Sequence, residues 1–164
     1  MISYHARITG GYGIGGIDYS SALIEIAKEV FASDASLKEL ICDEAINLPT
    51  NVAYDAIFSN SVFSYFPTEN YAAKVLDKML IKSNFSIGLL DIHDIEKKDA
   101  FEAYRRKTVE NYDIKYKNLS KLFYHKKFFY EWADRNNCEI EFYVPDMEGY
   151  WNNEFVFDVY FFKK

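Results

Sequence analysis

The stretch Gly16-Ile17-Asp18-Tyr19-Ser20-Ser21-Ala22-Leu23-Ile24-Glu25-Ile26-Ala27-Lys28 decides the fold. It predicts the end of a buried strand, an acidic residue at the strand tip, and an amphipathic helix. Apolar residues at the helical spacing i, i+3, i+4, i+7 and i+8 predict its buried face: Leu23, Ile26, Ala27, Val30 and Phe31. Ligands of open α/β sheets bind at the carboxyl ends of strands, so Asp18 is a candidate to hold two ribose hydroxyls. The alternative is that Asp18 is only a turn or cap residue.

The composition is that of a single globular domain, which we assign to residues 1–164. Hydrophobic residues make up 49% of the chain, enough for a substantial core. The net charge of −6 argues against general nucleic-acid binding, because phosphate contacts need clustered Lys and Arg. The two cysteines and three histidines show no disulfide framework and no zinc motif. No signal-peptide or membrane-spanning pattern is present, so we expect a cytoplasmic protein that does not contact a membrane.

Three later segments repeat the pattern of an apolar strand followed by polar residues. Leu40-Ile41-Cys42 precedes Asp43 and Glu44, and the carboxylate of Asp43 or the next backbone N–H is a candidate to recognise adenine. A near-continuous apolar run from Ala56 to Val62 contains Asn60 and Ser61 at its end. A further apolar strand, Ser86 to Leu90, is followed by Asp91. In a sheet of parallel strands, these tips would meet at one edge.

Together with the first stretch, these segments resemble, in order and spacing, the class I S-adenosylmethionine-dependent methyltransferases. The resemblance covers Gly16 to the C-terminus. It implies a Rossmann-like α/β fold: a mostly parallel sheet with helices on both faces and a C-terminal antiparallel hairpin. It also implies S-adenosylmethionine as the cofactor and a small-molecule or carbohydrate acceptor. The implied cofactor-binding residues are Asp18, Tyr19, Asp43, Glu44, Asn60 and Ser61.

The glycine run Gly10-Gly11-Tyr12-Gly13-Ile14-Gly15-Gly16 departs from the family pattern. In the family, a first strand ends in an acid and a glycine-rich turn, and a helix follows before the second strand. Here the run leads directly into Asp18, whereas a parallel crossover needs about a dozen residues or more. We therefore interpret it as a turn and strand entry and expect the first strand and helix of the family to be missing. Alternating apolar residues in Met1 to Thr9 suggest a makeshift first strand.

The densest group of titratable residues is Asp91, His93 and Asp94, which are the candidate catalytic residues. Histidine titrates near neutral pH and can accept a proton from an acceptor hydroxyl, and a neighbouring carboxylate would favour its charged form. The alternative is that His93 is an exposed loop residue and Asp94 a helix cap. The basic triplet Arg105-Arg106-Lys107 has two interpretations as well: it holds an anionic acceptor, or it belongs to a solvated helix face.

Three functional hypotheses follow. The first is methyl transfer to a small molecule, in which positioning of the acceptor supplies much of the rate. The second is a non-catalytic or truncated protein of the same fold that binds no cofactor. The third is a nicotinamide-dependent oxidoreductase, but its glycine fingerprint requires a strand before the glycines and a helix opening on them. A homodimer is compatible with each hypothesis.

Overall fold

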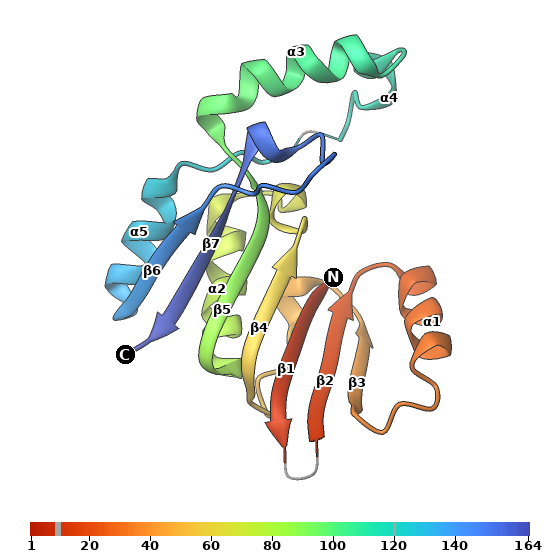
Figure 1. Ribbon diagram of the computed structural model, residues 1–164, viewed down its shortest axis with the longest axis vertical. Helices are drawn as coiled ribbons and strands as arrows, with labels where there is room; N and C mark the ends of the chain where they lie inside the picture. The colour runs from red at the N-terminus through yellow and green to blue at the C-terminus, as the bar shows by residue number, and fades with distance from the viewer. Residues whose placement is uncertain (9–10, 120) are drawn as a thin grey trace.

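The computed structural model describes residues 1–8, 11–119 and 121–164. Its centre is a seven-stranded sheet in the order β3-β2-β1-β4-β5-β7-β6 (Figure 1). The strands are β1 (Ile2–Ile8), β2 (Gly11–Asp18), β3 (Leu37–Cys42), β4 (Tyr54–Asn60), β5 (Ser83–His93), β6 (Cys138–Tyr143) and β7 (Val156–Lys163).

Five of these strands run in one direction, and two run against them. β2 pairs with β3, and β4 with β5, in parallel, whereas β1 is antiparallel to both β2 and β4. β7 is antiparallel to β5 and β6 and so forms the closing hairpin expected from the sequence. The prediction of a Rossmann-like sheet with a C-terminal antiparallel hairpin is therefore confirmed, but the sheet is mixed, because four of its six strand pairings are antiparallel.

β1 occupies the central position between β2 and β4. Ile2 lies opposite Ile17 on β2 and opposite Ser59 on β4, so β1 is hydrogen-bonded on both sides. This confirms that the N-terminal segment substitutes for the first strand of the family. The direction of β1 is reversed because the link to β2 is far too short for a parallel crossover. The start of the glycine run at Gly10, where the sequence predicts a turn, lies outside the described residues.

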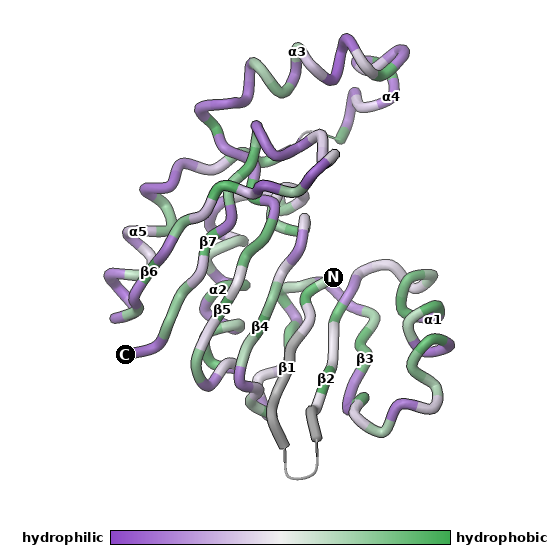
Figure 2. The backbone as a smooth tube through the Cα atoms, viewed as in Figure 1, coloured by the Kyte–Doolittle hydropathy of each residue, from purple (hydrophilic) through white to green (hydrophobic). Residues whose placement is uncertain are grey.

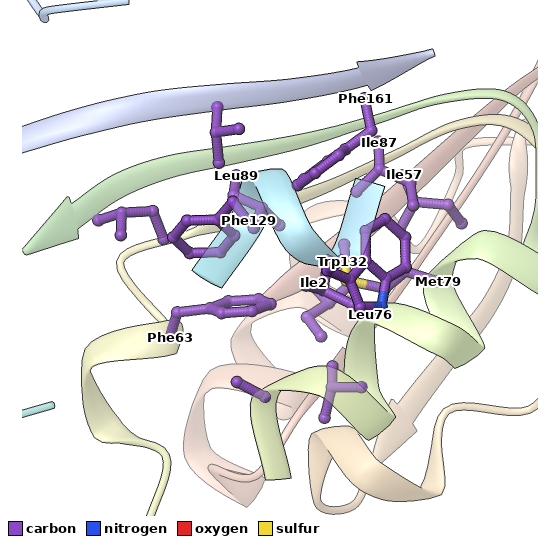
Figure 3. Close-up of a cluster of buried hydrophobic side chains, with 14 of the residues drawn as sticks. Ile2, Ile57, Phe63, Leu76, Met79, Ile87, Leu89, Phe129, Trp132 and Phe161 are labelled. Carbon is purple, nitrogen blue, oxygen red and sulfur yellow. The ribbon is translucent and has the colours of Figure 1, made fainter. Parts of the chain in front are cut away.

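The main core lies between the sheet and two helices, α2 (Glu69–Lys82) and α5 (Lys126–Arg135). Thr68 caps α2 by accepting a hydrogen bond from Tyr71 N. Figure 3 shows the core side chains that α2 and α5 turn toward the strands, among them Met79, Trp132 and Phe129. The remaining helices are α1 (Ser21–Val30), α3 (Lys98–Thr108) and α4 (Tyr112–Lys115), with short 3-10 turns η1 (Ala45–Asn47), η2 (Phe63–Tyr65), η3 (Ile95–Lys97) and η4 (Asn153–Phe155). Of the helices in the described ranges, none is both long enough and apolar enough to span a membrane.

α1 covers the opposite face of the sheet at its β2–β3 end. The connections β2–α1–β3 and β4–α2–β5 each join parallel strands, and such crossovers are right-handed. They run in opposite directions along the sheet, so α1 and α2 lie on different faces. Accordingly, Ile24, the buried residue of α1, is not part of the main core. In Figure 1 no helix crosses the viewer's face of β1, β4 and β5, where the missing first helix of the family would pack.

The exposure of the α1 side chains contradicts the buried face that the sequence predicts for this helix. Ile24 is buried, but Leu23, Ile26 and Val30 are between 51% and 70% exposed. Figure 2 shows the hydrophobic residues along α1 without a covering helix in the described chain. The predicted buried face was therefore wrong: α1 buries Ile24, and the predicted stripe lies largely exposed where no helix of the described chain covers it.

Lys82, the last residue of α2, binds to β3 on the other side of β1 in the sheet. Its ammonium group is fully buried and donates to Glu39 Oε1 on β3 at 2.7 Å. It also donates to the carbonyl oxygens of Pro49 and Val52, at 2.9 and 3.3 Å. These bonds satisfy a charge that would otherwise be costly to bury.

We predict that Gly88→Ala destabilises the fold by about 1–3 kcal/mol through overpacking. A Cβ at Gly88 would lie 2.6 Å from Phe58 Cδ1 and 3.1 Å from Tyr160 Cε1. The free energy of urea unfolding measures the loss. In a Phe58→Ala background the same substitution should cost clearly less, and an equal cost in both backgrounds would contradict this packing.

Candidate functional site

The carboxyl ends of β2, β3, β4 and β5 lie at one edge of the sheet, which is where ligands bind in open α/β folds. Asp18, Asp43, Asn60 and Asp91 lie on or directly after these strands. The sequence therefore identified correctly which residues meet at this edge. α3 and α4 lie above it in Figure 1.

Asp18 is positioned as a two-sided acceptor at the tip of β2. Its Oδ1 accepts a hydrogen bond from Ser20 N at 2.8 Å, and its Oδ2 lies 2.9 Å from the Met1 ammonium. Ser20 in turn caps α1 by accepting from Leu23 N. The carboxylate is thus oriented by the turn into α1. Tyr19, beside it, is 77% exposed.

Asp43 is an exposed acceptor at the tip of β3. Its Oδ1 accepts from Asn47 Nδ2 at 2.9 Å and from Glu44 N at 2.7 Å, and these bonds lower the pKa of Asp43. The Glu44 N–H, which the sequence offered as an adenine contact, is therefore already bonded within the turn. The Glu44 carboxylate accepts instead from the Tyr71 hydroxyl at 3.4 Å.

The glycine run does not form a loop at this edge. Gly11 to Gly16 lie within β2, which begins with Gly11 at the opposite end of the sheet from these strand tips. The amino end of β1 stands where the first strand of the family would end. The strand entry expected in this run is confirmed for Gly11 to Gly16. Asp18 and Asp43 could hold the nucleoside half of an adenosyl cofactor, whereas the described residues offer no glycine loop at this edge for its methionine half.

Asp91 sits in a β-bulge near the end of β5. Between the pairs Leu89↔Val159 and Ile92↔Phe157, two residues of β5 oppose the single residue Asp158 of β7. Asp91 has a positive φ of 64°, a conformation that few residues other than glycine adopt. Its backbone N–H donates to Asp158 Oδ1 at 2.9 Å. Bulges commonly re-aim a side chain next to a functional site.

The Asp91 carboxylate accepts three side-chain hydrogen bonds while only 8% of the residue is exposed. Ser61 Oγ donates to its Oδ2 at 2.5 Å, and the Tyr150 hydroxyl and Asn152 Nδ2 donate to its Oδ1 at 2.7 Å each. Burial and then the bond to Asp91 raise the pKa of Tyr150 to about 12, so Tyr150 stays a neutral donor. The result is a rigid polar cluster that fixes Ser61 at the tip of β4. Asn60, the last residue of β4, is exposed beside it.

Burial likewise raises the pKa of Asp158, next to Asp91. Tyr150, Asn152 and Asp158 were not among the sequence candidates, because they lie 59 to 67 residues after the groups they bind. The sequence predicted only that a C-terminal antiparallel hairpin closes the sheet, without its contact to β5.

His93 matches neither alternative that the sequence offered, the base whose charged form a carboxylate favours or the exposed loop residue. Only 1% of it is exposed, and its ring meets Phe101 and Phe123 edge-on at centroid distances of 4.9 and 5.4 Å. Neither ring nitrogen has a hydrogen-bond partner among the described residues. Burial lowers its pKa to about 4, so the ring is neutral and a weak base. Asp94 accepts from Glu96 N and so caps the 3-10 turn η3.

The basic triplet on α3 is largely engaged by neighbouring side chains. Arg106 bonds Glu102 and Asp113, and the Arg105 guanidinium lies 4.9 Å from the ring of Trp151. In the described ranges, no group of three or more His, Cys, Asp or Glu residues could hold a metal ion.

Comparison with known proteins identifies the fold of the chain. No family model and no curated protein matches the chain. Solved structures do match, and most of those found are methyltransferases. The chain has the class I methyltransferase fold. Magnesium protoporphyrin IX methyltransferase (ChlM) from Synechocystis PCC 6803, solved with SAH, aligns with a TM-score of 0.62 and 11% identity, over 92% of this chain and 63% of that one.

Two further structures show the range of this likeness. The N-methyltransferase NodS from Bradyrhizobium japonicum WM9, in complex with SAH, aligns with a TM-score of 0.63 and 10% identity, over 91% of this chain and 65% of that one. The small RNA methyltransferase HEN1 aligns with a TM-score of 0.61 and 17% identity, over 92% of this chain and 20% of that one. The chain thus spans less than two thirds of the length of each of these three structures.

We predict that Tyr150→Phe destabilises the protein by about 1 kcal/mol, since it removes one donor from the buried Asp91 carboxylate. Urea unfolding measures the loss. Tyr19→Phe, at an exposed position of the same edge, should change stability by less than about 0.5 kcal/mol. Equal effects of the two substitutions would contradict the Asp91 cluster.

We also predict that His93 makes the fold acid-sensitive. The unfolded chain binds a proton at His93 near the ordinary pKa of about 6.5, but the folded chain binds it only near pKa 4. The contribution of His93 to the free energy of unfolding is therefore fully present above pH 6.5 and is lost as the pH drops toward 4, with a loss on the order of 2 kcal/mol at pH 5. His93→Phe, which keeps a ring in the aromatic cage, should remove most of this difference between pH 7.5 and pH 5, whereas His125→Gln should not. An unchanged pH profile in His93→Phe would show this assignment to be wrong.

Proposed function

We propose that the protein binds an S-adenosylmethionine-type cofactor at the tips of β2 and β3 and methylates a small molecule above the tips of β4 and β5. The observation that carries this proposal is the Asp18 carboxylate, held at the end of β2 by Ser20 N in the fold of methyltransferases. A carboxylate in this place can accept hydrogen bonds from both ribose hydroxyls.

Ribose binding requires Oδ2 of Asp18 to release the Met1 ammonium. The side chain of Met1 is 34% exposed and that of Asp18 12% exposed, so water reaches the pair. A ribose would replace the one ammonium partner with two hydroxyl donors to the same carboxylate, and hydrogen bonds to a charged group contribute about 1.5–3 kcal/mol each. Asp43 and the Glu44 turn would line the adenine, and Tyr19 is available to cover the nucleoside from solvent.

The acceptor half of the site consists of Asn60, Ser61 and Asp91. The cofactor, when bound, supplies an electrophilic methyl group, so the protein's main task is to align a nucleophile. Asp91 holds the Ser61 hydroxyl in one orientation, and Ser61 with Asn60 would position the acceptor. Ser61 and the Asp91 carboxylate behind it are also the groups available to receive the acceptor's proton. His93 and Asp94, which the sequence suggested as catalytic partners, would act here as a buried wall and a cap.

A small molecule is the proposed acceptor because the net charge of −6 disfavours a phosphate-rich polymer. The proposal also includes a carbohydrate as the acceptor. The same fold is present in a small RNA methyltransferase, so RNA is an alternative that an acceptor screen should include.

The first experiment is calorimetric titration of the full chain with S-adenosylhomocysteine. We predict binding in the micromolar range that Asp18→Ala weakens at least about tenfold, the loss expected for hydrogen bonds to a charged acceptor. Asp34→Ala removes an exposed carboxylate in the turn before β3 and should leave binding unchanged. A folded protein that binds no S-adenosylhomocysteine would contradict the proposed function and favour a non-catalytic protein of this fold.

A further inference from the structure

A cavity of about 340 Å³ lies among α3, α4 and the chain segment that leads from α4 to Phe123. This volume is at the lower end of the range for small-molecule sites. Phe101 and Phe123 line the cavity, and the same two rings enclose His93 at the end of β5. The cavity therefore lies over the strand end that carries Asp91.

The lining of the cavity is cationic although the protein is acidic. Four basic and two acidic side chains line it, a net charge of +2 in a chain whose net charge is −6. Both acids, Glu102 and Asp113, bond to Arg106, at 3.1 and 3.0 Å. Lys98, Lys117 and Lys121 then remain, and none of them forms an ion pair with a residue in the described ranges.

Lys121 is the most enclosed of these three cations. It is half-buried, and its ammonium lies 4.8 Å from the ring centroid of Tyr65 and 6.0 Å from that of Phe101. Burial lowers the pKa of Lys121, because the charged ammonium is less stable away from water. The Asp91 carboxylate acts on it only from a distance and is already bonded to Ser61, Tyr150 and Asn152. A bound anion would remove much of the cost of burying this charge.

The cavity offers partly exposed aromatic surface at Tyr112 and Tyr116, whose ring centroids lie 4.9 Å apart. Aromatic side chains favour stacked or edge-on contacts with a planar ligand. Phe101 and Phe123 form a closed wall behind the cavity, because they are only 1% and 7% exposed and their rings meet edge-on at 5.5 Å. The Lys98 ammonium lies 5.7 Å from the centroid of the Phe123 ring, so a second cation lies beside this wall.

We propose that this cavity binds an aromatic carboxylate, with the ring on Tyr112 and Tyr116 and the carboxylate at Lys121, supported by Lys98 and Lys117. Asn60, Ser61 and Asp91 do not line the cavity, so this binding site does not depend on the proposed methyl transfer.

The experiment titrates the full chain, without cofactor, with 4-hydroxybenzoate and follows binding by NMR. We expect millimolar or tighter binding, with shifts at the amides of Tyr112, Tyr116 and Lys121. The neutral isostere 4-hydroxybenzamide and inorganic phosphate, which lacks the ring, should each bind at least about tenfold more weakly, because each loses one of the two contacts. Equal binding of the amide, or of phosphate, would overturn the proposal.

Lys121→Met keeps the length of the side chain and removes the charge, and it should weaken 4-hydroxybenzoate at least about tenfold, while Lys121→Arg should retain most of the affinity. Lys127→Met, on the exposed face of α5, is the matched control and should have no effect. If Lys121→Met fails to fold, Lys98→Met at an exposed position should weaken binding about threefold, consistent with the smaller energy of an exposed charge. Unchanged affinity in the folded variants would overturn the site.

The two proposals fail in different ways. Loss of S-adenosylhomocysteine binding with 4-hydroxybenzoate binding retained would remove the methyltransferase function and leave the anion site. The opposite result would remove the anion site alone.

Discussion

Backbone groups in the middle of a sheet must be hydrogen-bonded, and β1 supplies the partners for β2 and β4 together. Each buried backbone group left without a partner would cost about 1–3 kcal/mol, so a gap at this position would undo the fold. A hairpin is the shortest way to fill it, and a hairpin necessarily reverses the direction of the inserted strand. The antiparallel centre of an otherwise methyltransferase-like sheet follows from this constraint.

Reversing β1 has consequences at both edges of the sheet. The glycines lie within β2 and not in a loop at the strand tips, so the proposed cofactor site keeps Asp18 without a glycine loop from the described residues. The first helix of the family is lost with the crossover, and the apolar residues of α1 that it would cover remain exposed. The proposed acceptor half of the site does not depend on β1. It is built by β4, β5 and the hairpin that ends the chain, and the bulge at Asp91 turns that carboxylate toward Ser61.

Much of this arrangement could be predicted from the sequence. Apolar strands with polar tips place Asp18, Asp43, Asn60 and Asp91 at one edge, since carboxyl ends of parallel strands coincide. Tertiary contacts decide the rest. The side-chain partners of Asp91 are 30, 59 and 61 residues away in the sequence, and no periodicity reports a hydrogen bond across such distances.

His93 illustrates the same limit. Its place beside two carboxylates in the sequence suggested a charged base, but burial against Phe101 and Phe123 dominates the pKa. The unpaired lysines of the α3–α4 cavity were also unpredictable, because the sequence drew attention to the neighbouring arginines, which turn out to be engaged. A pattern of charges does not show which of them find partners.

The central claim is that β1 runs antiparallel between β2 and β4. In NMR spectra of the uniformly labelled chain, alternate pairs across β1 and β4 should give Hα–Hα contacts in the register Ile2↔Ser59 to His5↔Ala56, as close antiparallel pairs do. The amides of β1 should also exchange with solvent as slowly as those of β4 and β5. Contacts in a parallel register, or fast exchange throughout β1 in an otherwise folded protein, would contradict the account.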